Sequence, residues 1–137
     1  MTRILVIEDN DGVREELVEI LRYEGFDVRE AENGRLGLEL AKGWPPDLVI
    51  CDLMMPELDG YATLEAMRHD PATAAITFLC LTARGERRDM RKAMELGADD
   101  YLTKPFTVDE LLAALRAALA KRARSAPDAP HPDRGTS

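Results

Sequence analysis

The sequence predicts an α/β protein with a parallel sheet and helices on both of its faces. Short, uninterrupted apolar runs alternate five times with segments of helical periodicity. Strands that are covered on both faces are expected to lack polar alternation, as these runs do. Strict alternation of strand and helix favours a doubly wound sheet with right-handed crossovers. Alternation alone does not fix the order of the strands.

Each predicted element is bounded by residues that start or stop regular structure. The strands are expected at residues 4–7, 27–30, 47–52, 77–81 and 100–103. Asp11 can cap the first helix, and Gly25 ends it. Asn33 opens a short second helix, which Pro45-Pro46 prevents from continuing.

The three later helices carry similar boundary signals. The third helix is broken by Asp70-Pro71. The fourth is expected at about residues 86–96, and Gly97 stops it. Residues 107–110 form a capping box for the last helix, which carries an apolar stripe.

The folded part is predicted to be one domain at residues 1–122. A chain of 137 residues is long enough for one domain with one core. Residues 123–137 are rich in Pro and have no apolar periodicity, so we expect a disordered tail or a linker stub there.

Composition argues against two classes of function. The formal net charge of −8 disfavours direct nucleic-acid binding, which needs a surplus of Lys and Arg. No apolar stretch approaches the roughly 20 residues that span a bilayer, and the N-terminus does not resemble a signal peptide. Cys51 and Cys80 lie within apolar runs, so we expect buried, reduced thiols in a cytoplasmic protein.

Polar residues follow the apolar runs at the ends of four predicted strands. They are Glu8 and Asp9, Asp52, Thr82, and Lys104. Ligands of open parallel sheets bind where the carboxyl ends of strands meet a switch point. Each residue also has an ordinary interpretation, such as a solvated turn or a surface lysine. Together, three carboxylates, a hydroxyl and an ammonium indicate a Mg²⁺ and phosphoryl site.

The residue types suit phosphoryl transfer to a carboxylate. Asp52 can act as a nucleophile that becomes an aspartyl phosphate. Mg²⁺ uses one or two protein carboxylates and keeps several waters, so Asp9 and Asp52 can bind directly and Glu8 through water. Lys104 supplies a fixed positive charge, and its bond to Pro105 is a candidate cis peptide.

The chain resembles the receiver domain of two-component response regulators. The matching segments in order are Val6-Ile7-Glu8-Asp9-Asn10, Asp47-Leu48-Val49-Ile50-Cys51-Asp52-Leu53-Met54-Met55-Pro56, Leu81-Thr82-Ala83 and Gly97-Ala98-Asp99-Asp100-Tyr101-Leu102-Thr103-Lys104-Pro105-Phe106. The resemblance covers about residues 3–122. It implies a flavodoxin-like fold with strand order 2-1-3-4-5, which is also the order of the chemotaxis receiver.

The resemblance also implies roles for particular residues. Asp52 is the implied phosphoacceptor, and the implied cofactor is Mg²⁺. The implied metal ligands are Glu8, Asp9, Asp52 and the backbone carbonyl of Met54. The implied phosphoryl-binding and switch residues are Thr82, Ala83, Lys104 and Tyr101, of which Thr82 and Tyr101 form the switch pair. Asp52, Lys104 and Thr82 carry the transfer itself.

The implied function is a phosphorylation-dependent switch rather than an enzyme with a separate substrate. The implied phosphoryl donor is a sensor histidine kinase or a histidine phosphotransfer protein. The downstream protein would bind the face formed by the fourth helix, fifth strand and last helix. We expect a monomer or a weak homodimer, because Ala114 replaces the arginine that forms dimer salt bridges in winged-helix relatives.

Three alternatives remain at this point. The chain could be the receiver fragment of a larger transcriptional or enzymatic regulator, cut in its linker. A phosphatase of the haloacid dehalogenase type is disfavoured, because Met54 stands where such enzymes need a second Asp. The basic fourth helix is either a solvated face or a docking surface for an acidic partner; its charged residues are Arg84, Arg87, Arg88, Arg91 and Lys92.

Overall fold

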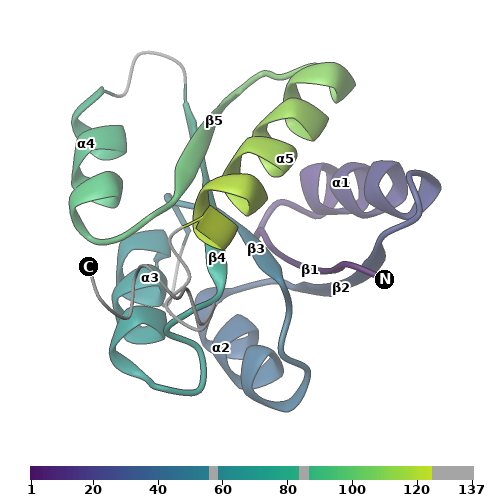
Figure 1. The fold of residues 1–137 in the computed structure, drawn as a ribbon. Coiled ribbons are helices and arrows are strands. Elements are labelled where there is room, and N and C mark those ends of the chain that lie inside the picture. Colours follow the sequence, from purple (N-terminus) through teal and green to yellow (C-terminus); the bar gives the residue numbers. More distant parts are fainter. Residues whose placement is uncertain (56–58, 84–86, 125–137) are drawn as a thin grey trace.

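The computed structural model describes residues 1–55, 59–83 and 87–124. Five parallel strands form one sheet in the order β2-β1-β3-β4-β5 (Figure 1). The strands are β1 (Arg3–Ile7), β2 (Asp27–Ala31), β3 (Leu48–Asp52), β4 (Thr77–Ala83) and β5 (Asp100–Lys104). The helices are α1 (Asp11–Tyr23), α2 (Gly34–Gly43), α3 (Gly60–His69), α4 (Arg87–Glu95) and α5 (Val108–Arg124). The predicted doubly wound sheet and its strand order are confirmed.

Two apolar layers hold the helices against the sheet. One layer packs β1 through Ile4 and Val6 against α1 and α5. The other packs β1 through Leu5 and Ile7 against α2, α3 and α4. Helices therefore cover both faces, with α1 and α5 on one side (Figure 1). The central strand β3 is buried along its whole length, as the continuous apolar run predicted.

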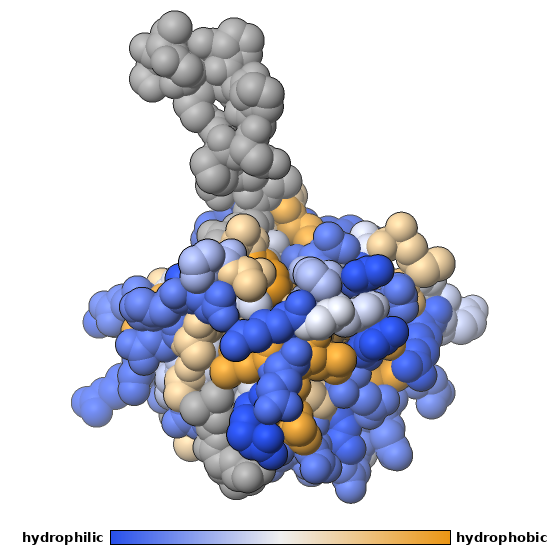
Figure 2. Space-filling model, turned by 90° about the horizontal axis from the view of Figure 1, so that it is seen from below, coloured by the Kyte–Doolittle hydropathy of each residue, from blue (hydrophilic) through white to orange (hydrophobic). Residues whose placement is uncertain are grey.

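The surface and the helix lengths fit a protein that buries its apolar groups in these layers. On the face in Figure 2, hydrophilic side chains dominate and apolar groups form narrow strips between them. Within the described ranges, no helix is both long and apolar enough to cross a membrane.

The first helix begins one residue differently from the prediction. Asn10, not Asp11, is the N-cap: its backbone is extended, and its side-chain oxygen accepts a hydrogen bond from the Val13 N–H at 2.9 Å. Asp11 is the first helical residue. Both residue types can cap, and the tertiary structure decides which of two adjacent positions leaves the helix. Gly25 follows the helix with φ +95°, in the left-handed region predicted for a stop.

Three other boundaries bear on the site. β4 continues through Thr82 to Ala83, two residues beyond the expected end. Helix α5 continues to Arg124, so the first two residues of the expected tail are helical. The start of the fourth helix was expected at residue 86, which lies outside the described part of the chain. The same holds for Arg84, for the loop residues 56–58 and for residues 125–137.

The strand register places the polar strand ends at one edge of the sheet. Ile7, the last residue of β1, pairs with Cys51 on β3. Asp52 then pairs with Leu81 on β4, and Ala83 pairs with Lys104 on β5. The residues that follow β1, end β3, end β4 and end β5 therefore meet at one edge.

Candidate functional site

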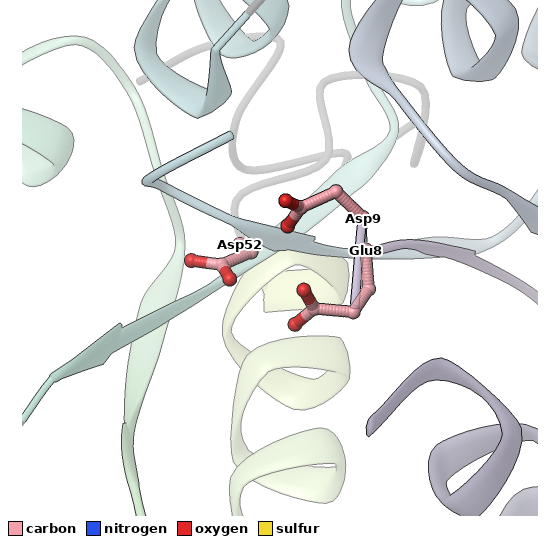
Figure 3. A group of neighbouring side chains, drawn as sticks. All are labelled: Glu8, Asp9 and Asp52. Atoms are coloured by element: carbon pink, nitrogen blue, oxygen red, sulfur yellow. The ribbon is translucent and has the colours of Figure 1, made fainter. Parts of the chain in front are cut away.

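Three carboxylates converge at this edge, as Figure 3 shows. Glu8 and Asp9 follow β1, and Asp52 ends β3. One carboxylate oxygen from each side chain lies within 4.8 Å of the others. Glu8 is fully buried, Asp52 is nearly so, and Asp9 is exposed. The cluster is therefore closed toward the protein and open to solvent on the side of Asp9.

Both oxygens of Asp52 have partners. The Met54 N–H donates to Oδ1 at 3.0 Å. The Lys104 Nζ donates to Oδ2 at 2.9 Å and lies 3.6 Å from Oε1 of Glu8. These contacts fix the plane of the Asp52 carboxylate and place one positive charge between two negative ones. The Lys104-Pro105 peptide is cis, as the sequence suggested.

Burial and charge shift the pKa values of this cluster. Burial is the main cause that raises the pKa of Glu8 to about 7, and the charge of Asp52 adds to it. The Asn10 N–H, which donates to Oε2 at 3.0 Å, and the Lys104 charge act in the opposite direction. For Lys104, burial disfavours the charged form, but the hydrogen bond to Asp52 and the charges of Asp52 and Glu8 outweigh it and raise its pKa.

One oxygen of the cluster is buried without a hydrogen bond. Oε1 of Glu8 has no hydrogen-bond partner, although the Lys104 ammonium lies nearby. A buried carboxylate oxygen without a partner is costly. A divalent cation would remove that cost, because hard cations prefer oxygen ligands such as those of the three acidic side chains. The donor set therefore fits a cation of the Mg²⁺ type.

The remaining predicted site residues lie on the two neighbouring strands. Thr82 is buried on β4, one residue beyond the partner of Asp52, and its hydroxyl makes a long 3.4 Å bond to the Ala83 carbonyl. Ala83 is exposed. Tyr101 lies on β5 opposite Cys80, and its side chain is 40% exposed. The register thus puts Thr82 and Ala83 at the site edge and Tyr101 lower on the outer strand.

The two cysteines are confirmed as buried and free. Cys51 and Cys80 are register partners on β3 and β4. Burial raises the pKa of the Cys51 thiol well above its usual range and that of Cys80 to about 12. Thiols with such values are poor nucleophiles. They belong to the core rather than to the site.

Sequence reasoning did not identify Arg14 as a site neighbour. Its Nη1 donates to the backbone carbonyl of Glu8 at 2.8 Å. A signal was available, because Arg14 stands near the start of α1, where a helix dipole disfavours positive charge. A cation in that position indicates a tertiary acceptor.

The fold and the site together place the chain in one class of protein: flavodoxin-like α/β domains with an acidic site at the carboxyl ends of the strands. The family model for the response regulator receiver domain matches residues 4–116. The chain therefore belongs to the receiver domain family of two-component response regulators. This assignment replaces the phosphatase alternative.

Known proteins agree with the assignment. The chain is 42% identical over 131 residues to the DNA-binding dual master transcriptional regulator RpaA of Synechocystis, covering 96% of this chain and 54% of that protein. It is 42% identical to the KDP operon transcriptional regulatory protein KdpE of Escherichia coli, covering 96% and 56%. The chemotaxis protein CheY4 of Vibrio cholerae superposes with a TM-score of 0.82 at 27% identity, covering 86% and 98%.

The curated relatives are longer than this chain, so the similarity applies to only part of each of them. The chain spans about half the length of the curated relatives that it matches. What is shared is the receiver part, which is a signalling switch that interacts with histidine kinases or phosphotransfer proteins.

Proposed function

We propose that Asp52 is the phosphoacceptor of this receiver. In the transfer, a carboxylate oxygen of Asp52 bonds to phosphorus while the bond from phosphorus to the donor histidine nitrogen breaks, and the electron pair of that bond stays on the nitrogen. The observation that carries the proposal is the Lys104 ammonium at 2.9 Å from Asp52, beside two further carboxylates. Little else is required, because phosphoryl transfer depends mostly on positioning and charge neutralisation.

The proposed cofactor is Mg²⁺. Glu8, Asp9, Asp52 and the Met54 backbone carbonyl would hold it, and the buried Oε1 of Glu8 supports this assignment. When bound, the cation would neutralise charge on the incoming phosphoryl group. Lys104 would pair with the same group from the side of β5, and it holds Asp52 in place before the transfer.

The proposed switch couples the phosphoryl group to β5, the outermost strand of the sheet on this side. Phosphorylation adds negative charge and acceptor oxygens beside Thr82 and Ala83. The Thr82 hydroxyl has only a weak 3.4 Å bond to give up, so it can move toward them. That movement would vacate space for the exposed Tyr101 ring to turn inward and change the face formed by α4, β5 and α5. A downstream protein would bind this face.

The assembly state, the location and the extent of the receiver are also part of the proposal. We expect a stand-alone switch, a monomer or weak homodimer, that acts in the cytoplasm and catalyses only its own phosphoryl transfer and dephosphorylation. Residues 1–122 would form the receiver, with α5 continuing to Arg124, and the residues that follow would form a tail or linker. A second candidate is the receiver part of a larger regulator, since the chain spans about half the length of the curated relatives that it matches. The reading frame beyond Ser137 separates the two.

The assignment of Asp52 can be tested with a small phosphodonor. The purified protein is incubated with acetyl phosphate and Mg²⁺, and protein phosphate that is labile to both acid and base is measured. Asp52→Asn should lose the label, whereas Asp27→Asn, a change at an exposed residue at the other end of the sheet, should keep it. Undiminished label on Asp52→Asn would refute the assignment.

A further inference from the structure

Arg14 links three elements at the edge of the site. Its side chain, 13% exposed, leaves α1 and makes three hydrogen bonds. Nη1 donates to the Glu8 carbonyl at 2.8 Å, and Nε donates to Glu30 on β2 at 3.0 Å. Nη2 donates to Asp11, the first residue of α1, at 2.6 Å. One rigid guanidinium thus joins the end of β1, the end region of β2 and the start of α1.

These bonds complete a set of restraints on Glu8. The Glu8 N–H donates to the Ala31 carbonyl at 3.1 Å, and its carbonyl accepts from Arg14. One oxygen of its carboxylate accepts from the Asn10 N–H. The backbone of Glu8 is therefore fixed on both sides at the point where the chain leaves the sheet. Asp9 is the next residue, so its orientation depends on the same restraints.

Within α1, Arg14 has a local partner in Asp11, three residues earlier, but that ion pair does not connect it to β1. A positive charge near the start of a helix interacts unfavourably with the helix dipole. Arg14 also pairs with Glu30, whose side chain is 39% exposed, so its charge is already balanced at the surface. The bond to the Glu8 carbonyl is therefore the contact that connects Arg14 to the acidic cluster.

We propose that Arg14 is a positioning residue that holds the Glu8-Asp9 turn in the geometry that binds a divalent cation. The inference rests on the proposed function of the acidic cluster, and the bond from Arg14 goes to the backbone carbonyl of Glu8 rather than to its carboxylate. Partners that orient metal ligands from outside typically change metal affinity 10- to 100-fold when they are removed. We expect Arg14→Met to weaken Mg²⁺ binding about tenfold.

Charge and positioning predict opposite signs for this variant. Removing a nearby positive charge would by itself strengthen the attraction between the cluster and Mg²⁺. Loss of the restraint on Glu8 weakens binding. Arg14→Lys keeps the charge but cannot reach three acceptors in a fixed fork, so it should resemble Arg14→Met. Glu30→Ala removes the anchor of Arg14 on β2 and should weaken binding in the same direction, by less.

The experiment measures the dissociation constant of Mg²⁺ by calorimetry on the unphosphorylated protein and the rate of Asp52 labelling by acetyl phosphate at several Mg²⁺ concentrations. Arg68→Met is the matched control. Arg68 donates to the carbonyls of Gly97, Ala74 and Ile76 and to Asp99 at the opposite edge of the sheet. It should lower the melting temperature and leave the Mg²⁺ dissociation constant unchanged.

Each outcome decides the proposal. Weaker Mg²⁺ binding by both Arg14 variants, with labelling largely restored at saturating Mg²⁺, supports positioning. An unchanged or tighter dissociation constant in Arg14→Met overturns it, and if that variant does not fold, an unchanged constant in Glu30→Ala does so instead. Failure of the wild-type protein to bind Mg²⁺ or accept the phosphoryl group would reject the proposed function itself, which is a distinguishable result.

Discussion

At the scale of single residues, Glu8 is a buried acid whose surroundings oppose its charge. Its side chain is fully buried beside Asp52, and one of its oxygens has no hydrogen bond. Lys104 compensates only partly, because its ammonium lies closer to Asp52 than to Glu8. Without a cation, ionised Glu8 therefore destabilises the fold, which is a cost that metal binding can recover.

This balance predicts a pH dependence for the metal-free protein. The pKa of Glu8 is about 7 in the folded chain against an ordinary value of 4.5. Between these values the folded state holds more protons than the unfolded state, so stability falls as pH rises from about 4.5 to 7. Glu8→Gln should remove this loss and be more stable than wild type at pH 8, by up to about 3 kcal/mol. Urea unfolding in excess chelator measures the difference.

The control for this prediction is an exposed acid on α1. Glu16→Gln removes a carboxylate at the surface and should leave the pH dependence unchanged. Equal stability of Glu8→Gln and wild type at pH 8 would contradict the proposed cost of the buried charge.

At the scale of elements, local signals in the sequence predicted most helix boundaries. The predicted capping box is present: the Thr107 N–H donates to Glu110 at 2.8 Å, and the Glu110 N–H donates to the Thr107 hydroxyl at 3.1 Å. Asn33 caps α2 as expected. These pairs are three residues apart, so the chain itself brings them together. The cap of α1 shows the limit of such local signals. The sequence predicted Asp11 but the structure has Asn10, because only the packing of the helix decides between two adjacent residues that can both cap.

For distant residues, the positions at strand ends predicted the shared site, but the strand order came only from the resemblance and some contacts were not predicted at all. Strict alternation of strands and helices did not give the strand order, since several parallel orders satisfy it. The convergence of Glu8, Asp52 and Lys104 depends on that order. The positive charge of Arg14 near the start of α1 indicates an acceptor elsewhere in the fold but does not identify it, because a backbone carbonyl can belong to any residue.

The start of α3 is the element boundary that most directly affects the site. Gly60 begins this helix directly against β3, and a Cβ at this position would overlap the Asp52 carbonyl oxygen and the Leu53 Cα. These are backbone atoms of Asp52, the proposed phosphoacceptor, and of the residue that follows it, so they cannot rotate away. Gly60→Ala should therefore lower the free energy of unfolding by about 1–3 kcal/mol and reduce Asp52 labelling.

Gly43 offers a comparison at the end of α2. Apart from its chain neighbours and the backbone of its own helix, no atom of the described residues lies within 4 Å of a Cβ built there. Gly43→Ala should leave labelling unchanged and keep or slightly raise stability, by up to about 0.5–1 kcal/mol. Chemical denaturation and acetyl phosphate labelling of both variants test this pair. Gly60→Ala with wild-type stability and labelling would show that α3 can shift away from β3 without cost.

At the scale of the whole molecule, the two edges of the sheet have different roles. The edge at the carboxyl ends of the strands carries the acidic cluster and Lys104. The opposite edge carries a dense set of structural contacts. There Arg68 joins the loops before β4 and β5. The guanidinium groups of Arg3 and Arg29 also lie there, 5.2 Å and 4.9 Å from the centre of the Trp44 ring.

This separation makes Trp44 a reporter of unfolding rather than of binding. It is the single tryptophan of the chain, it is almost fully buried, and Arg3 places it at the start of β1, whereas Glu8 follows the end of that strand. Mg²⁺ should therefore leave the Trp44 fluorescence of the folded protein unchanged. The same cation should still stabilise the fold, because it binds the folded state and not the unfolded chain.

The size of this effect follows from linkage. At 100 times its dissociation constant, Mg²⁺ should add about 2.7 kcal/mol to the free energy of unfolding. With a urea dependence of about 1–3 kcal/mol per M, the midpoint of the Trp44 transition should rise by roughly 1–3 M. Asp9→Ala should show little of this rise, because it removes the exposed one of the three carboxylates of the cluster. If the wild-type midpoint does not move with Mg²⁺, the three carboxylates do not form a cation site. If Mg²⁺ changes the Trp44 fluorescence of the folded protein, the two edges of the sheet are coupled.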